Sequence, residues 1–518
     1  MERALPPARS ESAPMGISLA DLVREIPGAH LAGEGASVRV TGVHHDSRAV
    51  EPGDLFVARP GQRFDGSTFI EDAVRRGAAA ILRSSADPAS GVFPVPVIHA
   101  DDVPRALAYA AAAVYGHPTF GLDVVGITGT NGKTTTSRLV AKCIQAGAGR
   151  CGIVGTLGHE FEGWFAEAKH TSPEADELAR IAATMKARGA THLVMEVSSI
   201  ALAAARADAV RFRVAALTNL TQDHLDYHGD MASYADAKAR LFIDLGPSSA
   251  AINEDDAFGV ELGKRLAYGL RKARYSAKPR VSPSVVEVAA ERVDLSSAGI
   301  RLTARTPSGL VEVASSLVGE HNVENLLCAI SIAWLLEIDR DAIGAALSTS
   351  FQVPGRLERC DEPGVDDVIV VVDYAHTPDA LERALKSVRA MTRGRVLCVF
   401  GCGGDRDPGK RPLMGAAVGR GADLGIVTND NPRSEDPRAI AAQIVPGLER
   451  EGARFTVELD RERAIQTAVL DASPGDVVLI AGKGHEPYQI IGAVTSAFDD
   501  RVVGRAALAM RRGRGGAA

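Results

Sequence analysis

The fold of this chain is decided by the stretch Leu122-Asp-Val-Val-Gly-Ile-Thr-Gly-Thr-Asn-Gly-Lys-Thr-Thr-Thr136. It starts as an apolar run typical of a buried strand and continues into a glycine-rich turn. Glycines at positions 126, 129 and 132 predict a tight turn whose backbone N–H groups can surround phosphate oxygens. Lys133 can then reach the terminal phosphates, and the hydroxyl of Thr134 or Thr135 can coordinate Mg²⁺. The stretch therefore predicts a nucleotide site between a strand and a helix.

The match to the general phosphate-loop pattern is incomplete at one position. The pattern GxxxxGK[ST] requires a glycine at position 127, where this chain has Ile127. The alternative is a glycine turn that happens to be followed by Lys-Thr. The apolar run before the turn and the helical segment after it favour the phosphate loop.

Apolar runs alternate with helical segments along most of the chain. This alternation is typical of doubly wound α/β sheets with parallel strands, and we expect an α/β fold. The runs predicted to be strands are 37–43, 54–57, 79–82, 95–98, 122–128, 191–197, 214–218, 367–373, 395–400, 424–428 and 476–481, and the stretches 71–76 and 101–115 are predicted helices.

Two proline-containing segments divide the chain into three predicted units. His117-Pro118 separates residues 15–118 from residues 119–353, and Val353-Pro-Gly-Arg356 opens a third unit over 354–510. The 518 residues agree with this division, since one domain per about 150 residues gives roughly three domains. Residues 1–14 are expected to be disordered, and the tail 511–518 is expected to be flexible.

The composition excludes several classes of protein. A net charge of −7 and only 5% aromatic residues argue against a nucleic-acid partner. No apolar run approaches the ~20 residues that span a bilayer, so no membrane insertion is expected. The six cysteines contain no CxxC pair, which favours a reducing compartment. We therefore expect a cytoplasmic protein.

Polar residues after two of the predicted strands are candidates for a metal centre. Glu196 ends the run 191–197, at the edge of a parallel sheet where ligands gather. After the next run, His224 and His228 stand four residues apart, a spacing that taken alone suggests zinc. No further zinc ligands stand at defined spacing, and oxygen ligands beside a phosphate loop favour Mg²⁺.

Five motifs in order along the chain resemble the Mur ligases of peptidoglycan synthesis. The resemblance extends over nearly the whole chain, from Asp46-Ser-Arg48 to Phe498-Asp-Asp500. The motifs are Gly129-Thr-Asn-Gly-Lys-Thr134, Thr218-Asn-Leu-Thr-Gln-Asp-His-Leu-Asp226, Gly319-Glu-His-Asn-Val-Glu-Asn325, Pro354-Gly-Arg-Leu-Glu358 and Asp373-Tyr-Ala-His-Thr-Pro-Asp379.

The resemblance implies a three-domain ligase that uses ATP and Mg²⁺. Residues 15–118 would form a smaller α/β UDP-substrate-binding domain, 119–353 a central parallel-sheet ATPase domain of the P-loop type, and 354–510 a Rossmann-like domain that binds an amino acid. Members of the family phosphorylate a carboxylate of a UDP-linked muramyl peptide with ATP, and an incoming amine then displaces phosphate. The expected partners are small-molecule substrates only, and the expected state is a monomer.

The same resemblance assigns roles around the nucleotide. The implied catalytic residues are Lys133, Glu196, His224, Lys238, Arg356 and Asp373. The implied metal ligands are Thr134, Glu196, His224 and Lys238, of which Lys238 matches a lysine that is carbamylated in the family. The implied ATP-binding residues are Gly129, Thr130, Asn131, Gly132, Lys133, Thr134, Thr135, Asn322 and Asn325, with Asn322 or Asn325 meeting the adenine.

Residues that align with the UDP-MurNAc-dipeptide site include departures from the family pattern. Family members often carry a His where this chain has Ile200, and a Gln where it has Ala204. Loss of that Gln removes a possible hydrogen bond to the substrate, with a net value of ~1 kcal/mol. The implied ligands of this substrate are Ser47, Thr171, Ser172, Ser198 and Arg206.

Asp430-Asn-Pro-Arg433 bears on which amino acid is added, and it resembles the meso-diaminopimelate-adding ligases. Diaminopimelate carries a second carboxylate where lysine carries only hydrogen, and a planar guanidinium can bind that carboxylate with two hydrogen bonds. Lysine would leave Arg433 unpaired, which disfavours it. The implied diaminopimelate ligands, with UDP-MurNAc-L-Ala-D-Glu as the acceptor, are Arg406, Asp430, Asn431, Arg433, Gly482 and Glu486.

Three alternatives stay open at this point. A lysine-adding ligase of the same family is opposed by Arg433. Folylpolyglutamate synthase shares the phosphate loop but should lack the UDP-type first domain and the Asp-Asn-Pro-Arg motif. A nucleotide-binding regulatory or scaffold protein that has lost the chemistry is supported only by Ile200 and Ala204.

Overall fold

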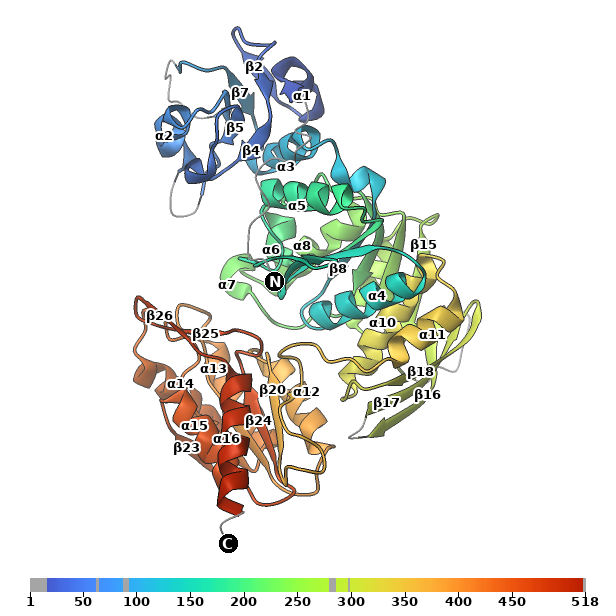
Figure 1. The fold of residues 1–518 in the computed structure, drawn as a ribbon, viewed down its shortest axis with the longest axis vertical. Helices are drawn as coiled ribbons and strands as arrows, with labels where there is room; N and C mark the ends of the chain where they lie inside the picture. Colours follow the sequence, from blue (N-terminus) through green and yellow to red (C-terminus); the bar gives the residue numbers. More distant parts are fainter. Residues whose placement is uncertain (1–15, 62–64, 87–92, 279–285, 297–298, 516–518) are drawn as a thin grey trace.

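The structure is a computed structural model that describes residues 16–61, 65–86, 93–278, 286–296 and 299–515. Three units follow one another along the long axis, with the N-terminal unit at one end and the C-terminal unit at the other (Figure 1). Each is built on a sheet rich in parallel strands, which confirms the predicted α/β class. The predicted disordered segment 1–14 lies outside the described residues.

The first unit is a five-stranded sheet with helices packed on it. Its strand order is β2-β7-β6-β5-β4, and only the edge strand β2 runs antiparallel to its neighbour. Alanine-rich α3 buries its apolar face in the core of this unit. The elements are β1 (Ile17–Ser18), α1 (Leu19–Glu25), β2 (His30–Ala32), β3 (Arg39–Val40), β4 (Gly42–His44), β5 (Asp54–Val57), α2 (Ile70–Arg75), β6 (Ala80–Ser84), β7 (Val97–Ala100) and α3 (Val103–Val114).

The middle unit is an eleven-stranded sheet of order β11-β10-β9-β12-β8-β13-β14-β15-β16-β17-β18. Strands β9, β12, β8, β13, β14 and β15 are mutually parallel, as predicted for this region. Its strands are β8 (Asp123–Thr128), β9 (Cys151–Gly155), β10 (Gly158–Phe161), β11 (Trp164–Ala166), β12 (His192–Glu196), β13 (Phe212–Leu217), β14 (Ser249–Asn253), β15 (Arg271–Ser276), β16 (Val288–Ser296), β17 (Gly299–Thr306) and β18 (Gly309–Ser315).

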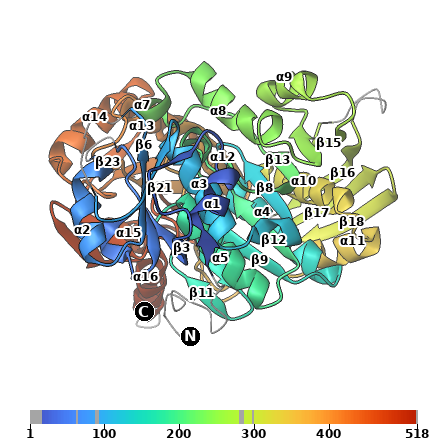
Figure 2. The same cartoon turned by 90° about the horizontal axis from the view of Figure 1, so that it is seen from above.

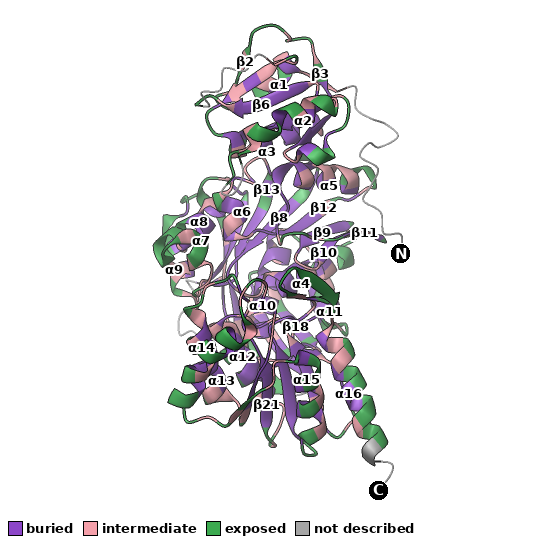
Figure 3. Ribbon diagram, turned by 90° about the vertical axis from the view of Figure 1, so that its left-hand side faces the viewer, coloured by how far each residue is buried: buried purple, intermediate pink, exposed green. Residues whose placement is uncertain are grey.

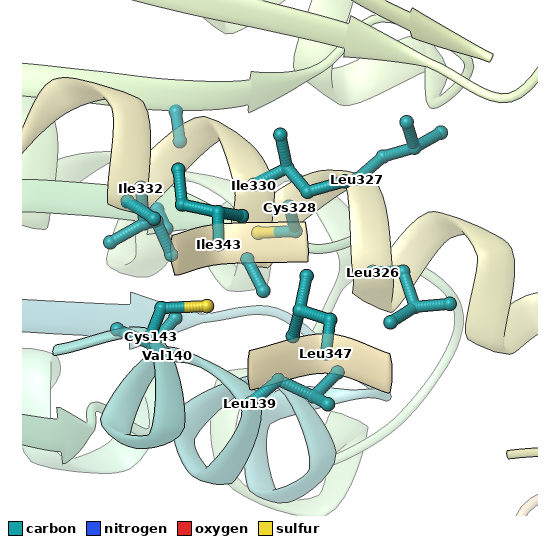
Figure 4. Packing of buried hydrophobic residues seen from close by; sticks show 14 of the residues in the cluster. Leu139, Val140, Cys143, Leu326, Leu327, Cys328, Ile330, Ile332, Ile343 and Leu347 are labelled. Atoms are coloured by element: carbon teal, nitrogen blue, oxygen red, sulfur yellow. The ribbon is translucent and has the colours of Figure 1, made fainter. Parts of the chain in front are cut away.

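Helices cover both faces of the parallel part of this sheet. On one face α4, α10 and α11 pack together, and Figure 4 shows their apolar side chains directed toward one another. The antiparallel strands β16–β18 form one edge of the sheet (Figure 2). The helices are α4 (Lys133–Ala146), α5 (Ala175–Ala187), α6 (Ser199–Ala203), α7 (Leu225–His228), α8 (Met231–Ile243), α9 (Ala257–Arg265), α10 (His321–Leu335) and α11 (Arg340–Ser348).

The C-terminal unit is a six-stranded sheet of order β19-β20-β24-β21-β22-β23, parallel except for β19. Its central strands are buried on both faces (Figure 3). The elements are β19 (Glu358–Arg359), β20 (Ile369–Asp373), α12 (Pro378–Arg389), β21 (Val396–Phe400), α13 (Lys410–Gly421), β22 (Leu424–Val427), α14 (Pro437–Arg450), β23 (Phe455–Val457), α15 (Arg461–Asp471), β24 (Val477–Ala481), β25 (Tyr488–Ile491), β26 (Val494–Ala497) and α16 (Asp500–Gly515).

Residues 511–515, the first part of the tail 511–518 that is predicted to be flexible, continue helix α16. Arg511 anchors this last turn, because its Nε and Nη2 donate to the carboxylate of Asp367 at 2.7 and 2.8 Å. Its Nη1 also donates to the carbonyl oxygen of Ala472 at 2.7 Å. These partners are distant in sequence, so the local Arg/Gly composition gave no sign of them. Residues 516–518 lie outside the described part of the chain.

Within the residues that the structure describes, no helix is both long enough and apolar enough to cross a membrane.

Candidate active site

The phosphate loop connects β8 to α4 at the centre of the middle sheet. Gly129 has φ +147° and Gly132 has φ +86°, which side-chain-bearing residues rarely adopt. A Cβ at Gly129 would collide with the hydroxyl of Thr218, and one at Gly132 with the amide oxygen of Asn325. Both glycines are therefore required by the turn and by close packing. The loop ends at the N-terminus of α4, where backbone N–H groups are open to an anion.

Gly126 does not belong to this turn, contrary to the prediction from sequence. It lies inside strand β8, with no left-handed backbone. A Cβ at this position would meet the ring of Phe212 on the neighbouring strand. Gly126 is thus a packing requirement of the sheet, which the spacing of glycines alone does not distinguish from a loop position.

Lys133 is the first residue of α4 and lies against the loop. Its Nζ donates hydrogen bonds to the carbonyl oxygens of Gly129 and Thr130, both at 2.8 Å. Burial lowers the pKa of Lys133, and the carboxylates of Glu196 and Asp223 oppose that shift. The ammonium is thereby held inside the loop, where it can face the terminal phosphates of a nucleotide.

Thr134 and Glu196 come together because β12 is the direct neighbour of β8 in the sheet. The hydroxyl of Thr134 donates to Glu196 Oε2 at 2.9 Å, and Glu196 is 1% exposed. Thr156 supports the carboxylate through its backbone N–H to Oε1 at 3.0 Å and its hydroxyl to Oε2 at 3.1 Å. Sequence reasoning missed Thr156, because this residue lies in the turn between β9 and β10 and belongs to no recognised motif.

The oxygen atoms of Thr134 and Glu196 fit a magnesium ion. Mg²⁺ is usually held by one or two carboxylates together with substrate phosphates and water. No group of three or more His, Cys, Asp or Glu side chains forms a metal cluster among the described residues, so a site built from protein ligands alone is not present there. The donor set therefore suits a cation that phosphate oxygens would complete.

His224 and Lys238, the other two implied metal ligands, both lie near the ring of Tyr234. His224 Nε2 lies 3.4 Å from Asp223 Oδ2, and Lys238 is 1% exposed with its Nζ 4.5 Å from the Tyr234 ring centroid. Burial and then Lys133 hold the pKa of Lys238 well below its usual range. In the described part of the chain, no hydrogen bond joins His224 or Lys238 to Glu196.

A cavity of about 80 Å³ adjoins the phosphate loop, between the middle and C-terminal units. The implied adenine residues Asn322 and Asn325 line it from α10. Their amides are mutually bonded, since Asn325 Nδ2 donates to Asn322 Oδ1 at 2.8 Å. The remaining lining residues include Asn131, Gly132, Thr134, Thr135, His321, Arg356, Asp373, Tyr374, His376 and Arg383.

Arg356 and Asp373 line this cavity from the side of the C-terminal unit. Arg356 Nη2 lies 3.3 Å from the hydroxyl of Thr134, and its guanidinium stacks 4.5 Å from the Tyr374 ring centroid. Asp373, at the end of β20, accepts the backbone N–H of Leu357 at 2.7 Å. Burial raises the pKa of Asp373, and Arg356 opposes this. The segment between the two units is therefore bonded to the phosphate loop on one side and to β20 on the other.

A second cavity, of about 320 Å³, lies at the carboxyl ends of β21, β22 and β24. All six implied diaminopimelate residues line it: Arg406, Asp430, Asn431, Arg433, Gly482 and Glu486. The middle unit contributes Ile200, Asp223, His224 and Asp226. The cavity thus brings two guanidinium groups and several carboxylates into one space, which suits a ligand with charges of both signs.

Arg433 has a left-handed backbone with φ +52°. Its Nη1 donates to the carbonyl oxygen of Gly404 at 2.8 Å, which directs the side chain toward the glycine turn that carries Arg406. The backbone N–H of Arg433 donates to Ile490 of the β25–β26 hairpin at 3.2 Å. Nη1 also donates to the carbonyl oxygen of Asn431 at 3.4 Å, which leaves the hydrogens on Nε and Nη2 for a ligand carboxylate.

The two cavities share Tyr374 and His376, which follow Asp373 on the loop after β20. His376 Nδ1 lies 2.8 Å from the carbonyl oxygen of Tyr374, and Lys410 Nζ donates to the carbonyl oxygen of His376 at 3.0 Å. Burial lowers the pKa of His376 to about 4, so its ring is neutral at neutral pH. Within the motif Asp373–Asp379, sequence reasoning assigned a role to Asp373 alone and missed Tyr374 and His376.

The implied dipeptide residues are brought together only in part. Ser172 accepts the backbone N–H of Ser198 at 3.0 Å and donates to the Glu196 carbonyl oxygen at 2.9 Å. The hydroxyl oxygens of Thr171 and Thr156 lie 3.1 Å apart, so this group borders Glu196. Ser47, buried in the first unit, lines neither cavity.

Arg206 is already paired within the protein. Its Nη2 lies 2.6 Å from Glu174 Oε1, and its Nη1 donates to the carbonyl oxygen of Ser172 at 3.1 Å. Glu174 also accepts from Arg59 of the first unit at 2.6 Å. Arg206 therefore helps to join two units, a contact that the sequence did not indicate.

Comparisons with known proteins show which proteins this chain resembles. Three protein-family models match the chain: the catalytic domain of the Mur ligase family over residues 39–115, the Mur ligase middle domain over 127–333, and the glutamate ligase domain of Mur ligases over 355–484. The chain is 47% identical to the UDP-N-acetylmuramoyl-L-alanyl-D-glutamate–2,6-diaminopimelate ligase of Gloeobacter violaceus, over 92% of this chain and 96% of that protein.

Solved structures are similar as well. That of a UDP-N-acetylmuramoyl-L-alanyl-D-glutamate–2,6-diaminopimelate ligase has 34% identity and a TM-score of 0.67, covering 96% of this chain and 99% of that chain. The MurF ligase from Thermotoga maritima in complex with ADP has a TM-score of 0.61 at 18% identity, covering 91% and 97%, and shares the fold.

Proposed function

This chain belongs to the Mur ligase family, and we propose that it is the ATP-dependent ligase that adds meso-2,6-diaminopimelate to the D-glutamate of UDP-MurNAc-L-Ala-D-Glu. The reaction forms an amide bond and converts ATP to ADP and phosphate. One observation carries the proposal: a cavity beside a phosphate loop and a cavity lined by two arginines meet at Tyr374 and His376. An activated carboxylate and an amine can therefore meet at that boundary.

The first step transfers the terminal phosphate of ATP to the glutamate carboxylate. Both reactants are anionic, so cations are needed where negative charge accumulates. Lys133 lies at the loop that would hold the phosphates, and Arg356 lies 3.3 Å from the Thr134 hydroxyl. Thr134 and Glu196 would hold Mg²⁺, which would neutralise phosphate charge there.

The second step is attack of the amine on the acyl phosphate. A C–N bond forms, the C–O bond to phosphate breaks, and the amine loses a proton. Glu486 and Asp430 suit the distal ammonium of diaminopimelate, and Arg433 and Arg406 suit its distal carboxylate. The opposite end of the amino acid would then face Tyr374, His376 and the nucleotide cavity.

Arg433→Lys is expected to raise the KM for diaminopimelate about tenfold, since the planar pair of hydrogen bonds to the distal carboxylate is lost, at about 1.5 kcal/mol. The KM for ATP should stay unchanged, because Arg433 does not line the nucleotide cavity. Steady-state kinetics with each substrate varied in turn measures both. Arg438→Lys, at an exposed position on α14, is the matched control. A diaminopimelate KM equal to that of the control would refute the carboxylate contact.

Lys238 is proposed to be carbamylated, so that it would supply an anionic oxygen ligand near the metal region. Carbamate forms from a neutral amine and CO2, and the burial of Lys238 beside Lys133 favours the neutral amine. Protein kept free of CO2 is expected to lose activity about tenfold and to regain it when bicarbonate is added. Lys238→Glu, which carries a permanent carboxylate, should show no response to bicarbonate. Wild-type activity that is indifferent to bicarbonate would contradict the carbamate.

The amino-acid substrate is tested by offering purified protein ATP, Mg²⁺ and UDP-MurNAc-L-Ala-D-Glu with either diaminopimelate or lysine. Phosphate release and a UDP-muramyl tripeptide mass are expected with diaminopimelate, because only this amino acid pairs Arg433. Release with lysine alone would make the chain a lysine-adding ligase. Nucleotide binding without release in either case would favour the regulatory alternative.

A further inference from the structure

Lys483 is a fully buried lysine directly after Gly482 at the end of β24, with an exposed fraction of 0%. A buried ammonium is costly unless hydrogen bonds and a counter-charge compensate it. The resemblance to known ligases assigned it no role, and it does not line the amino-acid cavity. Its burial therefore needs an explanation from its neighbours.

Its partners are two of the side chains that line the amino-acid cavity. Lys483 Nζ donates to Asn431 Oδ1 at 3.1 Å and to Glu486 Oε2 at 3.2 Å. Nζ also lies 5.3 Å from the Tyr488 ring centroid. The lysine thus joins the loop after β22 to the loop after β24 from behind the cavity wall.

Asn431 and Glu486 are oriented by the same network. Asn431 Oδ1 also accepts the backbone N–H of Ile490 at 3.0 Å, and Asn431 Nδ2 donates to Glu486 Oε2 at 2.9 Å. Lys483 and Asn431 both donate to Oε2 of Glu486. Among the described residues, no donor is bonded to Oε1 of Glu486. Oε1 is therefore the oxygen left for a ligand in the cavity.

We propose that Lys483 is a positioning residue of the amino-acid subsite, which fixes Asn431 and holds Glu486 as a carboxylate whose Oε1 receives the distal ammonium of the amino acid. This inference rests on the proposed function and deepens it. Lys483 would act through Glu486 and would not touch the substrate. The charge of Lys483 repels the distal ammonium of the amino acid. Lys483 must therefore favour binding through its effect on the ionisation and orientation of Glu486.

The charges around Glu486 explain why the lysine matters. Burial raises the pKa of the Glu486 carboxyl, Lys483 opposes that rise and Asp430 adds to it. Without Lys483, burial and Asp430 favour the protonated acid, which cannot pair an ammonium, while the hydrogen bond from Asn431 opposes them. The titratable and charged groups that face Glu486 from neighbouring elements are Lys483, Asp430, Tyr374, Tyr488 and Arg461.

The test is the full-length Lys483→Met variant, assayed with diaminopimelate varied at saturating ATP and UDP-MurNAc-L-Ala-D-Glu. Its KM for diaminopimelate should rise about tenfold at neutral pH, the size expected for loss of one charge-assisted hydrogen bond. Loss of Lys483 should raise the pKa of Glu486 further, and binding is lost as the pH falls through that pKa, so the KM of the variant should rise at a higher pH than the wild-type KM does. The KM for ATP should be unchanged. Lys386→Met, at an exposed position on α12, should retain wild-type constants.

A double-mutant cycle separates positioning from packing. Lys483→Met and Glu486→Gln should be strongly non-additive in the diaminopimelate KM, because the lysine acts through that carboxylate. Additive effects, a pH-independent KM or a fall in kcat at unchanged KM would overturn the proposal. If Lys483→Met does not fold, the Glu486→Gln variant is used as the test. Its KM for diaminopimelate should rise about tenfold. An unchanged KM would refute the proposal.

Failure of the inference can be told apart from failure of the proposed function. Wild-type protein that releases phosphate with diaminopimelate, while the variant keeps the wild-type KM, refutes only the role of Lys483. Wild-type protein that does not use diaminopimelate refutes the proposed substrate, and with it the inference.

Discussion

Lys133→Ala is expected to lower kcat about 10³-fold, the largest loss among the single substitutions considered, because removal of one preorganised donor at a site of developing charge costs about 10²–10³. Lys133 opens α4 and is held at the loop by two backbone carbonyl groups. The ammonium would have no substitute at the transferred phosphate. Single-turnover measurement of ADP formation checks this step directly.

The matched control is Lys142→Ala, which removes a half-buried lysine of the same helix, where Nζ contacts Thr349 and the Phe351 ring. It should retain wild-type turnover. The fold should survive the Lys133 change, since burial already disfavours this ammonium. A Lys133→Ala protein that turns over within about threefold of the control would contradict the role of the phosphate loop.

Glu196→Gln is expected to lower kcat about 10²-fold at ordinary Mg²⁺ concentration, with part of the loss recovered at higher Mg²⁺. The carboxylate is buried and accepts hydrogen bonds from Thr134 and Thr156, so the amide keeps its size but loses the charge. A neutral ligand binds Mg²⁺ less tightly than a carboxylate. Titration of Mg²⁺ at saturating ATP measures the shift in apparent affinity.

The control is Glu162→Gln at an exposed turn, where the carboxylate pairs with Arg150. Exposed pairs contribute about 0–1 kcal/mol, so its Mg²⁺ dependence should equal that of the wild type. A Glu196→Gln variant with an unchanged Mg²⁺ requirement would remove Glu196 from the metal site.

The nucleotide site was the part most open to prediction from sequence. A glycine turn after an apolar run, with Glu196 after another run, is a local pattern. Because β12 and β13 pair directly with β8, residues that end those strands meet at the loop. The six implied diaminopimelate ligands, which line the second cavity, also follow strands whose carboxyl ends lie next to one another in one sheet. The rule that parallel strands gather ligands at one edge predicted Glu196, whereas the six residues of the second cavity were assigned by the family resemblance.

Contacts between units were not open to prediction in the same way. Arg206 matched a substrate ligand, yet Glu174 and Arg59 of two different units form one ionic group with it. The polar, glycine-rich composition of the tail around Arg511 predicts flexibility, but its partners lie in other elements. Pairings of this kind depend on how separate elements pack, which local periodicity does not contain.

The antiparallel strands β16–β18 were also missed. Strands β17 and β18 largely alternate between buried and more exposed residues, and β16 is buried only at its first two residues, so these strands do not form the continuous apolar runs by which the parallel strands were recognised. The monomeric state and the cytoplasmic location stay predictions.

The most direct test of the central claim follows the oxygen atoms of the glutamate carboxylate. The account requires that this carboxylate be phosphorylated by ATP before the amine attacks, so one carboxylate oxygen must leave with the phosphate. UDP-MurNAc-L-Ala-D-Glu labelled with oxygen-18 in the reacting carboxylate should yield, with ATP and diaminopimelate, inorganic phosphate that carries one labelled oxygen and a tripeptide that has lost one. Tripeptide formation with unlabelled phosphate would contradict the account.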